Sequence, residues 1–124
     1  MGFDEFRTAI QAKITPQTIF FNPGGGTSQV VAVSDEQIRY RRGISTVTLR
    51  IRDIFDAYYF HRGDRMATTD LKEFRPSVYD SKARPSGHSC NCTFLLLLLQ
   101  ELGIVFEICG AGKKRDPFFV RIPK

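Results

Sequence analysis

The sequence has no apolar run long enough to cross a membrane. Its longest, FLLLLL at residues 94–99, has six residues, whereas a membrane-spanning helix needs about 20. The opening residues, MGFDEF, lack the basic and apolar regions of a signal peptide, and position 6 lacks the Ser or Thr of a myristoylation signal. We therefore expect no membrane partner.

Cysteine is scarce, with three residues in 124. An odd number of cysteines without a secretory signal fits a reducing compartment better than a disulfide framework. The cysteine content therefore predicts a cytoplasmic location.

The motifs that usually identify an enzyme are also missing. The chain has neither a GxxxxGK[ST] nor a GxGxxG phosphate loop, no nucleophile elbow and no PD…(D/E)xK run. Its only histidines are His61 and His88, and nothing in the sequence pairs them for acid–base catalysis. The glycines at residues 24–26 follow Asn-Pro and predict a hairpin turn. We expect no catalytic residues and no cofactor.

What is present is typical of one folded domain, residues 1–124. The chain is 42% hydrophobic and 25% charged, with 11 phenylalanines, which argues against disorder. Its length leaves no room for a second sizeable core.

Positive charge is concentrated after residue 36. Residues 1–36 carry two basic and four acidic side chains, a balance of −2, and residues 37–124 carry sixteen and nine, a balance of +7. A basic surface favours a polyanion such as nucleic acid. The alternative is a solvated surface without a specific partner.

The N-terminal part, residues 1–43, has the pattern of a helix followed by antiparallel strands. Apolar residues at helical spacing predict a helix over residues 3–13. TIFF and SQVVAV, on either side of the glycine turn, predict two strands. In QIRYRRGISTVTL, Ile38 and Tyr40 alternate with Arg39 and Arg41, so one face is apolar and the other cationic. This stretch predicts two strands, or a strand and a turn.

From residue 51 the apolar period becomes helical, and the helix is expected to end at Gly63. A second helix is expected in TTDLKEF, with Thr69 as its cap and Pro76 stopping or bending it. After a polar loop over residues 80–87, a third is expected over residues 91–102, closed by Gly103. IVFEI and PFFVRI then predict two strands around the loop CGAGKKRD.

The junction HSCNCTFLLLLLQEL, residues 88–102, has several interpretations. His88, Cys90, Cys92 and Cys109 are possible zinc ligands, but their spacing differs from the usual C-x2–4-C pairs. Cys90 at a helix start is a possible reactive thiol. The leucines, apolar on every side, favour a buried helix with a polar N-terminal end. We therefore expect no metal site.

The order of elements in the second part, residues 44–124, resembles that of winged-helix DNA-binding domains. LRIRDIFDAYYFHRG, TTDLKEFRPSVYD and CNCTFLLLLLQELGI match the three helices, and VFEICGAGKKRDPFFVRI matches the wing. The resemblance covers about two thirds of the chain. It implies that the third helix enters a major groove, with His88, Ser89, Asn91 and Thr93 near it. It also implies that Lys113, Lys114 and Arg115 of the wing contact the DNA backbone.

The sequence thus predicts an α+β protein with an N-terminal helix, antiparallel strands, three further helices and a C-terminal β-hairpin. The expected function is non-enzymatic nucleic-acid binding, with duplex DNA as the expected ligand and a homodimer as a possible form. The expected contact residues are Arg39, Arg41, Arg42, Arg50, Arg52, His88, Asn91, Lys113, Lys114 and Arg115. Asn91 is the side chain best suited to a base edge.

The alternative is a homo-oligomeric interaction protein or small-ligand protein with no nucleic-acid role. In that case the leucine helix, or the aromatic face formed by Phe55, Tyr58 and Tyr59, would be buried between chains.

Overall fold

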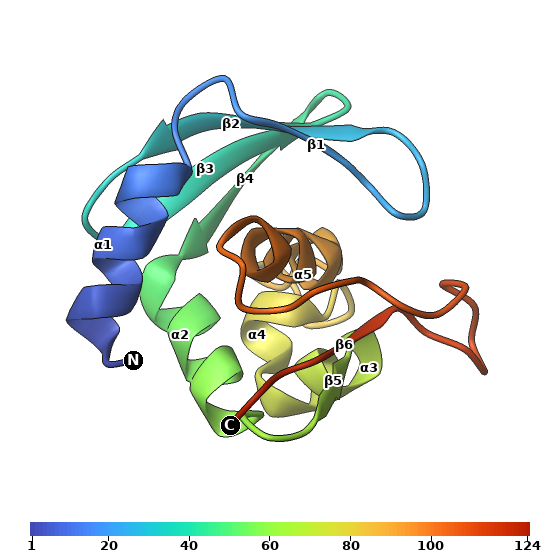
Figure 1. Ribbon diagram of the computed structural model, residues 1–124. Coiled ribbons are helices and arrows are strands. Elements are labelled where there is room, and N and C mark those ends of the chain that lie inside the picture. The colour runs from blue at the N-terminus through green and yellow to red at the C-terminus, as the bar shows by residue number, and fades with distance from the viewer.

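The computed structural model describes residues 1–124 as an antiparallel sheet packed on a group of helices (Figure 1). The expected α+β class is confirmed. In chain order the elements are α1 (Phe3–Lys13), β1 (Ile19–Phe21), β2 (Thr27–Val33), β3 (Gln37–Arg42), β4 (Ser45–Arg50), α2 (Ile51–Phe60), β5 (Arg65–Ala67), α3 (Thr68–Phe74), α4 (Pro76–Tyr79), α5 (Cys90–Glu101) and β6 (Phe119–Arg121). One cluster of 27 buried residues forms the core between the two layers.

The large sheet is a meander with strand order β1-β2-β3-β4, every neighbouring pair antiparallel. Apolar and polar side chains alternate along its strands, so one face is buried and the other is exposed to solvent, as the sequence predicts. Ile38 and Tyr40 of β3 are fully buried, whereas Arg39 and Arg41 are exposed. The Asn-Pro-Gly-Gly-Gly stretch forms the β1–β2 turn, in which Gly25 and Gly26 have positive φ angles of 110° and 75°. The prediction of a hairpin turn is therefore confirmed.

Helix α5 is the central element of the core. It lies between the sheet and helices α3 and α4 (Figure 1). Its five consecutive leucines, residues 95–99, are all at most 6% exposed, and Phe94 stacks on Tyr40 with the ring centroids 3.7 Å apart. Gly103, with a φ of 76°, follows the helix end. The expectation of a helix buried on all sides is confirmed.

The aromatic residues of α2 are covered by α1. Phe6 stacks on Tyr58 at a centroid distance of 5.4 Å and meets Phe55 edge-on at 5.5 Å. Phe55 and Tyr58 are both 7% exposed, whereas Tyr59, at 51%, and Phe60, at 69%, face solvent. The leucines, Phe55 and Tyr58 are thus buried within the monomer, so the structure gives no support to these side chains as an oligomer interface.

Helix α3 begins one residue earlier than its expected cap. Thr69 is inside the helix, and the residue preceding the first turn is Ala67. The Asp70 carboxylate accepts the Ala67 backbone N–H at 2.8 Å, which is half of a capping box. The prediction of Thr69 as the cap is wrong, because a carboxylate three residues into the helix satisfies the free backbone donor instead.

The C-terminal segment differs most from expectation. Residues 104–108 form no strand, and β6 pairs with β5, a three-residue strand that has no pattern in the sequence. In place of the expected hairpin, this segment has two isolated β-bridges, one between Cys109 and Phe119 and one between Lys113 and Asp116. Gly110 and Gly112, with φ angles of 91° and 72°, place irregular backbone where a regular ladder would need extended residues.

A buried ionic cluster joins the end of the sheet to the helices. Asp53 is 3% exposed and accepts hydrogen bonds from Arg75 at 2.6 Å and from Arg50 at 3.0 Å. Tyr79 donates its hydroxyl hydrogen to the Asp53 carbonyl at 2.9 Å. Because the cluster draws on β4, α2, α4 and the α3–α4 junction, it fixes these elements relative to one another.

None of the helices combines the length and the apolar composition that a bilayer crossing requires.

Candidate functional site

The arginines that the sequence groups together are separated by the sheet. Arg39 and Arg41 lie on its solvent face, opposite Thr48 and Thr46 of β4. Arg42, the next residue on the opposite face, reaches toward α5 and donates a hydrogen bond to the Thr93 hydroxyl at 3.2 Å. The cations of β3 therefore serve two different surfaces.

Arg50 and Arg52 already have partners within the protein. Arg50 pairs with the buried Asp53, and its hydrogen bond to that carboxylate raises the pKa of Arg50 further. Arg52 lies 3.8 Å from the Asp56 carboxylate, and its guanidinium lies over the Phe3 ring at 3.7 Å from the centroid. Both side chains remain more than half exposed, but part of their charge is compensated locally.

Asn91 is not available to a base edge. It is 1% exposed. Its carboxamide oxygen accepts the Tyr40 hydroxyl hydrogen at 2.7 Å, and its nitrogen donates to the Val78 carbonyl at 3.0 Å. The expectation that Asn91 reads a base is wrong, because burial of α5 turns this side chain into the core. For the same reason α5 offers no free face to a major groove.

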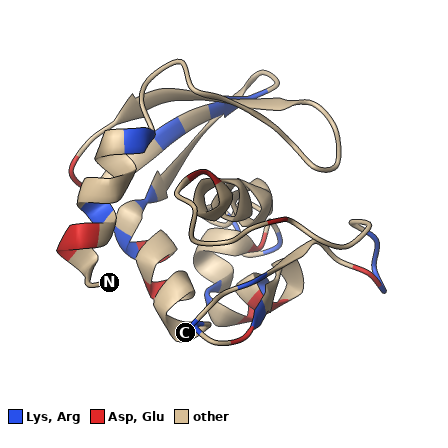
Figure 2. Cartoon of the chain, viewed as in Figure 1, with Lys and Arg blue, Asp and Glu red and all other residues tan.

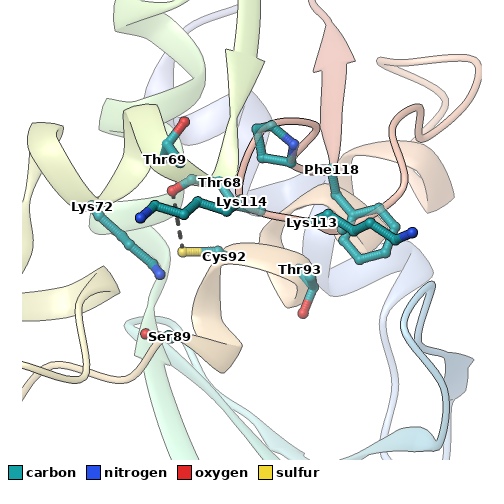
Figure 3. A pocket seen from close by; sticks show the side chains of 11 residues that line it. Thr68, Thr69, Lys72, Ser89, Cys92, Thr93, Lys113, Lys114 and Phe118 are labelled. Atoms are coloured by element: carbon teal, nitrogen blue, oxygen red, sulfur yellow. Dashed lines mark hydrogen bonds between the residues drawn. The ribbon is translucent and has the colours of Figure 1, made fainter.

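A cavity of about 350 Å³ opens where three segments distant in the sequence meet (Figure 3). We call it the three-lysine pocket, because it brings together Lys72 of α3 with Lys113 and Lys114 of the C-terminal loop. The other lining residues are Thr68, Thr69, Ser89, Cys92, Thr93, Gly112, Pro117 and Phe118. No carboxylate is among them.

The lysines approach this pocket from different directions. Figure 3 shows Lys72 and Lys114 extending toward the side of Cys92 and Thr68, while Lys113 points the opposite way. The Cys92 thiol donates to the Thr68 carbonyl at 3.7 Å and to the Tyr79 carbonyl at 3.4 Å. Burial raises the pKa of Cys92 to about 12, so the thiol stays protonated at neutral pH. The pocket wall therefore contributes no negative charge.

Three further depressions border the N-terminal end of α5, and two of them contain cations without a carboxylate. One, of about 500 Å³, is lined by Arg42, His88 and Cys90 together with Ser45, Thr46 and Val47. The other, of about 330 Å³, adjoins it at His88 and includes Arg84. Neither contains Asp or Glu. We define the α5-front surface as the six side chains Arg42, Lys72, Arg84, His88, Lys113 and Lys114.

The acidic residues are placed elsewhere. The four strands of the large sheet contain none, and the Asp and Glu side chains are carried by helices and connecting segments (Figure 2). In the C-terminal loop, Asp116 pairs with Lys113 through backbone hydrogen bonds, and Arg115 is exposed but does not line the pocket. Three of the four cavities that border this helix end thus contain five Lys or Arg and no carboxylate. The fourth, lined by Asn91, contains Asp53, which is paired with Arg50 and Arg75.

The possible zinc ligands do not converge. Cys92 lies in the core at 1% exposure, and Cys109 pairs by backbone with Phe119. Cys90 accepts a hydrogen bond from the Tyr40 hydroxyl at 3.2 Å. No three His, Cys, Asp or Glu side chains are arranged to hold a metal ion, and all three cysteines are free thiols.

Sequence reasoning missed Lys72, Arg84 and the threonines at the start of α3. Lys72 has the pattern of an ordinary solvated residue on a short amphipathic helix, and Arg84 that of a polar loop. They contribute to the surface only because α3, the loop before α5 and the C-terminal loop meet in space. No local pattern contains that information.

Comparison of the chain with protein-family models, with curated proteins and with solved structures finds no match.

Proposed function

We propose that the protein binds nucleic acid without catalysing a reaction on it, and that the α5-front surface is its principal contact. The single observation that carries this proposal is the convergence of five Lys and Arg side chains, without a carboxylate, on three of the cavities around one helix end. Unpaired cations that share a surface attract the phosphates of a backbone.

The proposed contact is to the backbone and not to base edges. Lysine and arginine contacts to phosphates provide affinity with little sequence preference. The side chain best suited to base reading, Asn91, is buried, and α5 has no exposed face. Binding therefore differs from the recognition-helix mode that a winged-helix resemblance implies, although a basic loop still serves as the contact that the wing would make.

The proposal includes duplex DNA as the first ligand to test and the cytoplasm as the place of action. The three free thiols are consistent with a reducing compartment.

The test is fluorescence anisotropy of labelled mixed-sequence duplex DNA, titrated with salt. We expect micromolar or tighter binding that weakens steadily with salt. Replacing Lys113, Lys114 and Arg115 together by Gln should weaken binding. It should also reduce the magnitude of the salt slope by about one for each phosphate that the variant no longer neutralises.

The matched control removes three cations elsewhere, with Lys13, Arg62 and Lys124 replaced by Gln. All three are exposed and none lines a cavity of the α5-front surface. Equal losses of affinity in the two triple variants would show that only net charge matters and would overturn the assigned surface. Absence of binding at low salt would overturn the function itself.

A second candidate, association of two copies through the sheet, is favoured by a different observation. Ile19 and Phe21 of the edge strand β1 are 54% and 79% exposed on the solvent face. Exposed apolar side chains on an edge strand favour pairing with another chain. Sedimentation analysis of the wild-type protein and of Phe21→Ser tests this. A monomer at all concentrations would exclude it.

A further inference from the structure

The three-lysine pocket differs from the rest of the α5-front surface in its lining, which combines three lysines with four hydroxyl side chains. It is bounded by the first turn of α3, the first turn of α5 and the C-terminal loop. Its volume of about 350 Å³ lies at the lower end of the range of small-molecule pockets. A cavity of this size admits one phosphate group with part of a nucleotide, but it is too small to enclose a duplex.

The charge of the pocket exceeds what one internal phosphodiester can neutralise. Lys72 and Lys114 bring two ammonium groups to the same side of the pocket (Figure 3), Lys113 adds a third charge at its margin, and no lining residue opposes them. An internal diester carries one negative charge, whereas a phosphate monoester carries between about 1.5 and 2 at neutral pH. The Coulomb attraction of the pocket therefore favours the monoester.

The neutral donors of the pocket also fit a monoester. Ser89 accepts the Ser81 backbone N–H at 3.1 Å, and Thr93 donates to the Cys90 carbonyl at 3.3 Å. The bond from Thr93 uses its hydroxyl hydrogen, whereas Ser89 only accepts, so the hydroxyl hydrogens of Thr68, Thr69 and Ser89 remain for a ligand. A monoester presents three terminal oxygens to hydroxyl and ammonium donors, one more than an internal diester.

One aromatic side chain borders the phosphate region. Phe118 lines the pocket, and its ring lies so close to Gly112 that a Cβ at position 112 would come within 2.4 Å of it. Gly112 also has a φ of 72°. The loop is therefore held in a conformation that brings its two lysines and an aromatic face to the same cavity. Base–aromatic stacking adds affinity without sequence preference.

We propose that the three-lysine pocket binds the terminal phosphate monoester of a nucleic-acid strand in preference to internal phosphodiesters. This inference rests on the proposed nucleic-acid-binding function. Under it, the rest of the α5-front surface contacts the backbone adjoining the strand end. The side chains assigned to the terminal phosphate are Lys72, Lys114, Thr68 and Thr69.

The experiment compares three duplexes of one sequence, ending in 5′-phosphate, 3′-phosphate or hydroxyl groups only. We expect the duplex with the preferred phosphorylated end to bind about fivefold tighter than the hydroxyl duplex, because the monoester adds between about 1.5 and 2 negative charges close to the lysines. Lys72→Gln should bring this ratio close to one, and Lys13→Gln should leave it unchanged. Lys114→Gln, with thermal unfolding of each variant, separates loss of the pocket from loss of the fold.

The outcomes distinguish the two proposals. Equal wild-type affinity for all three duplexes would overturn the terminal-phosphate assignment and leave nucleic-acid binding standing. No binding to any duplex would overturn the proposed function. In that case, chemical-shift changes of Thr68 and Thr69 on addition of a nucleoside monophosphate would identify a free nucleotide as the ligand, and would overturn the strand-end assignment. The same changes with inorganic phosphate alone would exclude any role for the nucleoside.

Discussion

At the N-terminal end of α5, the side chain of Asn91 is a structural connector. It joins Tyr40 of the sheet to the Val78 carbonyl of α4, so it spans the core at the point where the polar end of α5 is buried. Buried polar groups remain stable only when their hydrogen bonds are made. Its neighbours Cys90 and Thr93 are less buried and border the cavities of the α5-front surface.

We predict that Asn91→Ala lowers the free energy of unfolding by about 1–3 kcal/mol, because it removes two buried hydrogen bonds, one from the Tyr40 hydroxyl and one to the Val78 carbonyl, which keeps only the His88 N–H. Urea denaturation measures the change. Tyr40→Phe is the matched control and should cost less, because Asn91 keeps its bond to Val78. A folded Asn91→Ala protein with unchanged stability but weaker nucleic-acid binding would contradict the structural role.

At the scale of elements, α3 is positioned by its first turn. Asp70 holds the free N–H of Ala67 at 2.8 Å, and this fixes where Thr68, Thr69 and Lys72 enter the pocket. The C-terminal loop is positioned by Gly110 and Gly112 in the left-handed region of φ. A Cβ at position 110 would also come within 2.1 Å of the Pro117 carbonyl oxygen. The Asp70 cap and the two loop glycines thus bring lysines from distant segments together.

We predict that Asp70→Ala destabilises the protein by about 1 kcal/mol, the usual cost of losing a helix cap. Thr69→Ala should change stability by less than about 0.5 kcal/mol, as expected of a helical side chain without a capping bond. Thermal unfolding of the two variants side by side measures the difference. A larger loss for Thr69→Ala would show that the hydroxyl, and not the carboxylate, caps α3.

At the scale of the whole molecule, the two layers are joined through groups that ionise only at high pH. Tyr40 connects the sheet to α5, Tyr79 connects α4 to α2, and Cys92 faces α3 and α4. Burial raises the pKa of all three, that of Cys92 from 9.0 to about 12. The folded protein keeps these protons at pH values where the unfolded chain releases them.

We therefore predict that stability is lost at alkaline pH. The free energy of unfolding should be constant with respect to these groups up to about pH 8. Above about pH 9 it should fall by ~1.4 kcal/mol per pH unit as the Cys92 thiol ionises in the unfolded chain. Above about pH 10 the two tyrosines should steepen the fall. Urea titrations at about pH 8, 9.5 and 10.5 measure the slope.

Cys92→Ala is the control for the alkaline prediction. It should be less stable at about pH 8, because a buried side chain is shortened, but its stability should change less between about pH 9 and 10. An identical slope in the two proteins would show that the Cys92 thiol is not the group responsible.

The sequence by itself determined the local structure wherever a periodic pattern was long enough. The alternation of Ile38 and Tyr40 with Arg39 and Arg41 decided the faces of β3. The run of leucines decided that α5 is buried, since no side of it can be solvated. The helix over residues 3–13 and the glycine turn at residues 24–26 follow from signals within a few residues.

Tertiary structure decided the rest, because those outcomes depend on contacts between segments far apart in the chain. The three residues of β5 carry no pattern, and β6 pairs with them instead of with residues 104–108. Asn91 has the chemistry of a base-reading residue and becomes a core group only because Tyr40 and Val78 meet it. The three-lysine pocket draws on residues 68–72, 89–93 and 112–118. A sequence pattern reports the spacing of side chains along one element, whereas a pocket requires the relative placement of several.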